Sequence, residues 1–172
     1  EAEKTSRGAH IKGLLQVGPD EEITAIVSLM NFSDDLYIFM TTSNGVVKKV
    51  RSSEFARAKT RGIIGIKLND GDKLISAIAT KGDSDIMLIS RRGKGLRFKD
   101  SSVRSMGRAS CGIKGMKLAE GDEIAAAVKV EDDTSMILMT EKGYGKKISF
   151  DHYSAHGRGT GGQRVFGNTE GK

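Results

Sequence analysis

The chain has 172 residues, including 22 glycines, one proline and no tryptophan, so it can bury a core and its glycines indicate many tight turns rather than a collagen-like or proline-rich segment. The 28 Lys and Arg against 22 Asp and Glu give a formal net charge of +6, which favours an acidic partner such as nucleic acid or an anionic surface. A single cysteine excludes an intramolecular disulfide and a multi-cysteine zinc site, no apolar run reaches the ~18 residues of a membrane span, and a first residue other than Met leads us to expect a piece of a longer cytoplasmic protein.

Short runs rich in Ile, Val and Thr, bounded by Gly, Asp or Ser, predict β-strands along the chain. In chain order they span residues 23–27, 35–40, 74–79, 86–90, 124–130 and 136–140, and one helical turn is expected within residues 52–58. Between paired strands, a hydroxyl residue followed three positions later by glycine predicts a hairpin with a positive φ at Gly45, Gly93 and Gly143. Four methionines in or near strands are expected in the core: Met87, Met116, Met136 and Met139.

Two blocks of sequence recur with a period of about 50 residues. Residues 62–74 return as 112–124, with a looser copy at 8–15 and 20–23, and the hairpin block 42–50 returns at 90–98 and 140–148. Four strands in about 50 residues is typical of a propeller blade. We therefore predict an all-β, propeller-like domain of four-stranded blades over residues 1–172. Its repeats lie at about 7–56, 57–106 and 107–156, with a partial repeat at 157–172, so about three blades are present and the ring does not close.

Charge is sorted by position within the repeat. Residues 42–67, 91–117 and 141–164 together hold 21 basic and 4 acidic residues, whereas residues 18–36, 68–86 and 118–136 hold 15 acidic and 3 basic ones. Mixed charge that only solvates turns would not sort three times in phase, so we expect one positive stripe across successive blades. Few aromatic residues lie among these cations, which favours phosphate contacts along duplex DNA over stacking on single-stranded bases.

Two sets of basic residues are expected to contact DNA phosphates. The first set occupies the recurring segment that leads into each next blade: Arg57, Lys59, Arg61, Arg104, Arg108, Lys114, Arg158 and Arg164. The second set lies in the hairpins, where strand alternation can turn one of two neighbouring side chains inward: Lys48, Lys49, Arg97, Lys146 and Lys147.

No motif predicts catalysis, a cofactor or a metal. Residues 157–162 match G-x-G-x-x-G, but a strand rather than a helix is expected after them, and residues 107–112 lack the Lys-Ser/Thr of a phosphate-binding loop. The histidines lack metal-ligand spacing with Cys111 and are expected at the surface: His10, His152 and His156. The paired carboxylates recur in phase and are expected to be turn residues: Asp70, Asp72, Glu120 and Asp122.

Residues 96–98, residues 103–118 with Gly121 and Asp122, and residues 156–162 resemble the C-terminal domain of the bacterial DNA gyrase A subunit. The resembling stretch runs from about residue 7 to residue 166. The resemblance implies a β-pinwheel, which is a propeller-like disc whose blades exchange strands and whose basic rim wraps duplex DNA. In that family the wrap supports the negative supercoiling of DNA by gyrase.

The resemblance further implies a non-catalytic domain without a cofactor, joined to the gyrase B subunit and to the rest of its own gyrase A polypeptide in a nucleoid-associated type II topoisomerase. The family's basic, glycine-rich heptapeptide box is absent near the start of the chain, and residues 157–163 resemble it only faintly. Two alternatives stay open. One is the equivalent domain of the topoisomerase IV A subunit, and the other is a protein-interaction propeller, which would expose an apolar patch bearing aromatic side chains.

Overall fold

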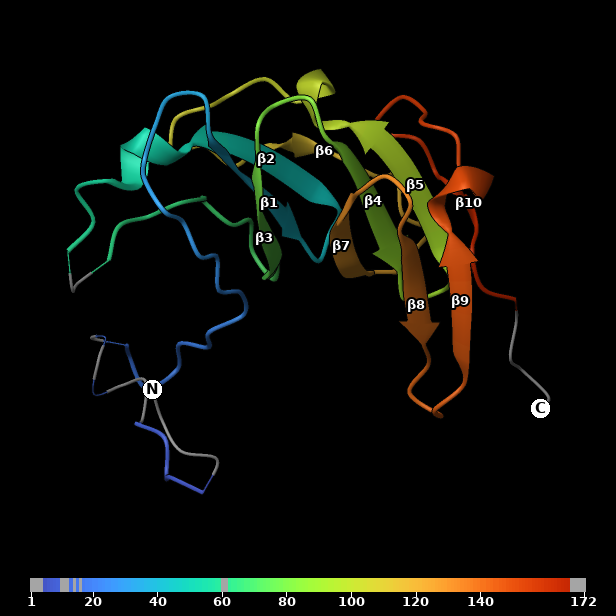
Figure 1. Ribbon diagram of the computed structural model, residues 1–172, viewed down its shortest axis with the longest axis horizontal. Coiled ribbons are helices and arrows are strands. Elements are labelled where there is room, and N and C mark those ends of the chain that lie inside the picture. Colours follow the sequence, from blue (N-terminus) through green and yellow to red (C-terminus); the bar gives the residue numbers. More distant parts are fainter. Residues whose placement is uncertain (1–4, 10–12, 14, 16, 60–61, 168–172) are drawn as a thin grey trace.

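The structure is a computed structural model, and it describes residues 5–9, 13, 15, 17–59 and 62–167. The regular elements of these residues are β-strands and single turns of 3-10 helix, which confirms the all-β prediction (Figure 1). In chain order they are β1 (Tyr37–Thr42), β2 (Val46–Arg51), η2 (Ser52–Phe55), β3 (Leu74–Thr80), β4 (Asp85–Ser90), β5 (Lys94–Lys99), η3 (Asp100–Ser102), β6 (Ile113–Lys114), β7 (Ile124–Val130), β8 (Ser135–Met139), β9 (Gly145–Ser149), η4 (Phe150–His152) and β10 (Gln163–Arg164).

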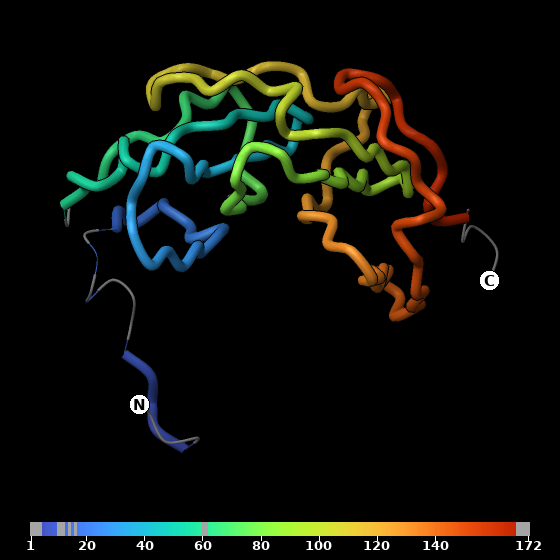
Figure 2. Tube along the Cα trace, turned by 45° about the horizontal axis from the view of Figure 1, so that its top comes forward, coloured from blue at the N-terminus to red at the C-terminus, as the bar shows by residue number. Residues whose placement is uncertain are grey.

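These strands form two four-stranded sheets and one hairpin. The first sheet has the order β3-β1-β2-β6, the second has the order β10-β5-β4-β7, and β8 pairs with β9. All named strand pairs are antiparallel. The sheets lie along an arc, with β3 and β7 toward its concave side and β6 and β10 toward its convex side (Figures 1 and 2).

Each four-stranded sheet draws its strands from three successive sequence repeats. In the first sheet, β1 and β2 form a hairpin, β3 follows from the next repeat, and β6 lies more than 60 positions beyond β2. In the second sheet, β7 and β10 take the same places beside β4 and β5. The exchange of strands that the resemblance implies is therefore present, and a blade is not a contiguous piece of sequence.

The three hairpins turn through the same local bonds. The hydroxyl oxygen of Thr42, Ser90 or Thr140 accepts the N–H four positions later, at 3.2 Å in each hairpin. The glycine three positions after each hydroxyl has a positive φ, with values of 77° at Gly45, 74° at Gly93 and 83° at Gly143. These values confirm the predicted turns, since a left-handed conformation favours glycine over residues with a Cβ.

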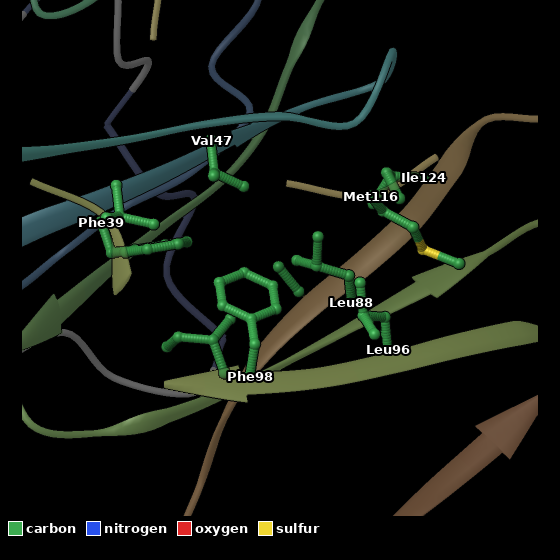
Figure 3. Packing of buried hydrophobic residues seen from close by; sticks show 10 residues of the cluster. Phe39, Val47, Leu88, Leu96, Phe98, Met116 and Ile124 are labelled. Atoms are coloured by element: carbon green, nitrogen blue, oxygen red, sulfur yellow. The ribbon is translucent and has the colours of Figure 1, made fainter. Parts of the chain in front are cut away.

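The core lies between the successive sheets. Phe39 and Val47 of the first sheet pack against Leu88 and Phe98 of the second, and Met116 closes the cluster from the segment after β6 (Figure 3). A second cluster joins the second sheet to the β8–β9 hairpin, with Met87, Ile89, Met136, Ile148 and Val165 among its buried members. Because each sheet buries both faces against its neighbours, the order of the sheets fixes the order of the segments that follow them.

Two predictions about this region are wrong. Residues 23–27 form no strand in the structure, since none of the described residues pairs with them as β1 pairs with β3. Met139 is 73% exposed rather than buried, because no sheet covers its face of the β8–β9 hairpin. Met87, Met116 and Met136 are buried as expected.

Candidate nucleic-acid interface

Each sheet is bordered on its outer strand by a link, the segment that leads to the next repeat. Link 1 is residues 56–73, link 2 is residues 103–123 and link 3 is residues 153–167. In link 2 the Met106 N–H donates to the Lys49 carbonyl at 2.8 Å, and in link 3 the His156 N–H donates to the Arg97 carbonyl at 2.8 Å. Links 2 and 3 then return as β6 and β10 beside the same outer strands. They run along the convex side of the arc (Figure 2).

Consecutive links are joined to each other by equivalent backbone hydrogen bonds. The Lys67 N–H of link 1 donates to the Ser110 carbonyl of link 2 at 3.1 Å, and the Lys117 N–H of link 2 donates to the Thr160 carbonyl of link 3 at 2.9 Å. Donors and acceptors are each separated by one repeat in the sequence. The links therefore form one continuous rim, on which a given link position recurs from sheet to sheet.

Arg108 and Arg158 make the same cross-link between neighbouring links. Nη1 of Arg108 donates to the Ile64 carbonyl at 3.2 Å, and Nη1 of Arg158 donates to the Lys114 carbonyl at 3.1 Å. Nε of Arg108 also lies 4.0 Å from Oε2 of Glu54. These two arginines position the rim through bonds inside the protein, while the Arg158 side chain stays exposed and Arg108 is half-buried.

Five of the predicted link cations are exposed, and within the described residues none of them forms a salt bridge with a carboxylate. They are Arg57, Lys59, Arg104, Lys114 and Arg164. Arg61 lies outside the described residues. The exposed lysines Lys67 and Lys117 belong to the same rim but were missing from the predicted set. The signal was available, because both follow a Gly-Ile or Gly-Met pair at the same position of the repeated block.

Lys48 is buried, which contradicts the expectation that its ammonium is available to a phosphate. Its Nζ donates to the carbonyls of Gly65 at 2.9 Å, Ser110 at 2.9 Å and Arg108. Burial lowers the pKa of Lys48 below its ordinary value. Since an ammonium has three N–H donors, Lys48 holds link 1 and link 2 together from inside the molecule.

Lys49 and Arg97 are also directed into the protein, against the prediction. The Lys49 side chain is buried, donates to the Asp100 carbonyl at 2.9 Å and lies 5.1 Å from the centre of the Tyr37 ring. Arg97, one repeat later, is half-buried and donates to the Phe150 carbonyl at 3.0 Å and, through Nε, to Oδ2 of Asp85 at 2.8 Å. Asp100 and Phe150 begin equivalent 3-10 turns, so both cations join a hairpin to the next repeat.

The last two predicted cations, Lys146 and Lys147, are exposed. They occupy the repeat positions of Lys48 and Lys49, whose side chains are buried against the following repeat. Their exposure thus reflects the uncovered state of the β8–β9 hairpin, and we do not assign them to the rim.

Carboxylates of the in-phase turns stabilise the hairpins. Oδ1 of Asp72 accepts from the Ser43 hydroxyl at 2.8 Å and from the Asn44 N–H at 3.0 Å. Oδ1 of Asp122 accepts from the Arg92 N–H, at the equivalent turn, at 3.1 Å. Burial raises the pKa of Asp72, but its hydrogen bonds outweigh that effect and hold the pKa below the ordinary value. These contacts confirm that Asp72 and Asp122 are turn residues.

The described residues include no group of His, Cys, Asp or Glu side chains arranged to hold a metal ion. A helix able to cross a membrane is likewise absent from the described part of the chain, whose helices are single 3-10 turns. His10 lies outside the described residues, and His152 and His156 are exposed as expected.

Sequence relatives of the chain are bacterial. It is 54% identical over 110 residues to the A subunit of DNA gyrase from Treponema pallidum, an alignment that covers 64% of this chain and 14% of that relative. It is 48% identical over 107 residues to the A subunit of DNA gyrase from Escherichia coli K12, covering 62% of this chain and 12% of that relative. The chain therefore spans only a small part of these full-length relatives.

Solved structures show the same fold. The C-terminal domain of DNA topoisomerase IV matches with a TM-score of 0.85 and 28% identity, over 92% of this chain and 50% of that chain. The DNA gyrase A C-terminal domain matches with a TM-score of 0.82 and 32% identity, over 91% of this chain and 52% of that chain. These matches confirm the propeller-like fold.

The model of one family matches the sequence three times, over residues 36–81, 84–131 and 134–171, and its description is "DNA gyrase C-terminal domain, beta-propeller". Each match begins at a hairpin and, in the first two cases, ends just after the strand that pairs with that hairpin's first strand. Because the matches cover more than half of the chain, it belongs to the DNA gyrase C-terminal domain family.

Proposed function

We propose that this domain binds duplex DNA along the rim formed by its three links and bends the duplex around that rim. The observation that carries the proposal is the register of the rim: links joined by equivalent hydrogen bonds hold exposed cations that form no salt bridge with a described carboxylate. Cations at repeated spacing along a convex edge suit the repeated phosphates of a duplex backbone. Few exposed aromatic side chains accompany them, so the expected binding is tolerant of sequence.

Bending is part of the proposal because the links follow an arc (Figure 2). Duplex DNA is stiff, and bending a site of 20–30 base pairs by 40–90° costs about 1–6 kcal/mol, so several phosphate contacts are needed to offset that cost. The rim provides such contacts on successive sheets. Within a gyrase A polypeptide, the domain would have no catalytic role of its own. It would present a bent DNA segment to gyrase B and to the rest of gyrase A in support of negative supercoiling.

The test is a binding assay on linear duplex DNA over a series of salt concentrations. If about six phosphates are neutralised, log K falls against log salt with a slope near −5. The variant R104Q/K114Q/R164Q removes three rim cations whose side chains form no hydrogen bond or salt bridge within the described residues. We expect its slope to fall to about −3 and its affinity to fall with it, because each lost phosphate contact removes about 0.9 from the slope.

The matched control is K73Q/K81Q/K142Q, which removes the same charge from three exposed lysines at hairpin tips and at the β3–β4 turn. This control should keep most of the slope and the affinity. Equal losses in the two triple variants would refute the rim and leave only a general effect of net charge. A slope near zero for the unaltered domain would refute DNA binding altogether. Retarded migration of DNA with a bound domain placed mid-fragment, relative to end placement, would support bending.

A further inference from the structure

The third hairpin, β8–β9, lacks the two flanking strands that complete the other sheets. In the first sheet β3 pairs with β1 and β6 pairs with β2, and in the second sheet β7 pairs with β4 and β10 pairs with β5. Within the described residues, no strand pairs with the outer edge of β8 or of β9. An edge of this kind presents unpaired N–H and C=O groups to any strand of matching pattern.

The exposed face of β8 is apolar, and its equivalents in the other sheets are buried. Ile137 is 70% exposed and Met139 is 73% exposed. One repeat earlier, Met87 is 0% exposed and Ile89 is 6% exposed, because the hairpin of the following repeat packs on that face. The apolar patch on β8 is therefore the surface of a blade whose neighbour is absent, and it is built like an interior surface.

The opposite end of the arc carries the complementary feature. Residues 23–29 occupy the sequence position of β3 and β7 in the preceding repeat, yet they pair with no described strand. Val27 and Leu29 pack on the first sheet against the cluster of Ile38, Met40 and Val50. The segment is thus already positioned beside the first sheet as β7 is positioned beside it on the other face, and it lacks only a hairpin.

The side chains of this segment that face away from the first sheet are exposed. Ile23 is 46% exposed and Ile26 is 83% exposed, whereas the equivalent residues of β7, Ile124 and Ala127, are 1% and 8% exposed. A hairpin placed beside residues 23–29 would cover both isoleucines. The two ends of the molecule therefore lack opposite parts of one blade.

We propose that a second copy of this chain joins the first head to tail, with residues 23–29 of one copy adding to β8 of the other. The known register of the complete sheets fixes the pairing. Met87 is opposite Val128 in the second sheet, so Ile137 would be opposite Val27 of the other copy. Residues with like patterns then meet, since β7 and residues 23–29 both carry their apolar side chains on the two faces of an inner strand.

Size and shape favour a closed pair of copies. The chain covers 50% of the topoisomerase IV domain and 52% of the gyrase A domain that share its fold, so two copies match one complete solved domain in length. The β8–β9 hairpin and the segment before β1 lie at the two ends of the arc, on its concave side (Figure 2). A head-to-tail contact that closes on itself yields a ring, and here both contacts of the ring would be the same.

Lys147 supports this arrangement independently. Lys49 donates to the carbonyl of Asp100, and Arg97 donates to the carbonyl of Phe150, which in both cases is the first residue of the 3-10 turn of the next repeat. Lys147 holds the same position in the third hairpin and is exposed. The next 3-10 turn around the ring is η2 of the second copy, whose first residue is Ser52.

The first measurement is the mass of the chain in solution by sedimentation equilibrium over the micromolar range, without DNA. We expect twice the 18.5 kDa of one chain. A single-chain mass throughout that range would overturn the proposal. The variants Ile26→Lys and Ile137→Lys each place a charge in one half of the contact, at a side chain that is exposed in the single chain, so each should fold and sediment as a single chain.

The matched control is Ile64→Lys, which adds the same charge at an isoleucine that is 66% exposed on link 1, and it should keep the doubled mass. Mixing the two single-chain variants separates head-to-tail pairing from other dimers. Residues 23–29 of the I137K chain and β8 of the I26K chain are both unaltered, so the mixture should regain the doubled mass through one intact contact. A mixture that stays single-chain, or a doubled mass that survives both lysine substitutions, would refute the head-to-tail contact.

Discussion

The replacement Lys48→Leu tests whether Lys48 holds the first two links together. Lys48 is 0% exposed, and its ammonium is hydrogen-bonded to the carbonyls of Gly65, Arg108 and Ser110. Leucine is an informative replacement because Leu96 occupies the equivalent position of the next repeat and is also buried there. The change therefore keeps an apolar side chain of tolerated shape and removes only the three donated hydrogen bonds.

The cost follows from what the carbonyls lose. Ser110 keeps the hydrogen bond from the Lys67 N–H, whereas no other described donor bonds to the carbonyl of Gly65 or Arg108. An acceptor left without a partner in the interior costs about 1–3 kcal/mol, and burial of leucine in place of an ammonium returns part of that cost. We expect the free energy of unfolding to fall by about 2–4 kcal/mol, which lowers the Tm of a domain of this size by roughly 5–15 °C.

Calorimetry or thermal denaturation followed by circular dichroism measures this effect, with Lys142→Leu at an exposed hairpin tip as the control for loss of charge. The control should stay within about 0.5 kcal/mol of the unaltered domain. Below its Tm, the K48L variant should also keep the salt slope of DNA binding, because its ammonium contacts no phosphate. A Tm equal to that of the control, or a slope reduced by about 1, would refute the internal role.

Two further predictions concern the turns. Asp72→Asn should reduce the acid sensitivity of the fold: the folded pKa of Asp72 lies below its ordinary value of 3.8, so the stability it contributes is present above that value and is lost as the pH falls through the folded pKa. Urea denaturation between pH 5 and 2 measures this, and an unchanged dependence on pH would contradict it. Gly112→Ala should destabilise the domain by more than about 2 kcal/mol, because φ is +92° and a Cβ would lie 2.6 Å from the Val47 carbonyl oxygen. Gly107→Ala, where a Cβ would meet nothing within 4 Å, should leave the stability nearly unchanged, and equal effects of the two changes would contradict the close approach.

Much of this protein could be read from local sequence. The repeat of about 50 residues, the hydroxyl residues Thr42, Ser90 and Thr140 and the glycines of the same turns predicted the hairpins, because a turn is closed by residues within four positions of each other. The exposed cations of the links were predicted for a similar reason. Segments rich in Gly, Ser and Lys or Arg cannot bury their side chains in a core and must run over the surface.

The fate of the hairpin cations was decided by tertiary structure alone. β2 is covered on its outer edge by β6, which lies more than 60 positions later in the chain, so Lys48 and Lys49 are interior although their local sequence matches that of exposed Lys146 and Lys147. Residues 23–27 have the pattern of a strand and form none, since a strand exists only where another segment accepts its hydrogen bonds. Local sequence sets which residues can turn, extend or stay at the surface, whereas pairing between distant segments sets which edges are covered, and only the covered edge turns a surface lysine into an internal one.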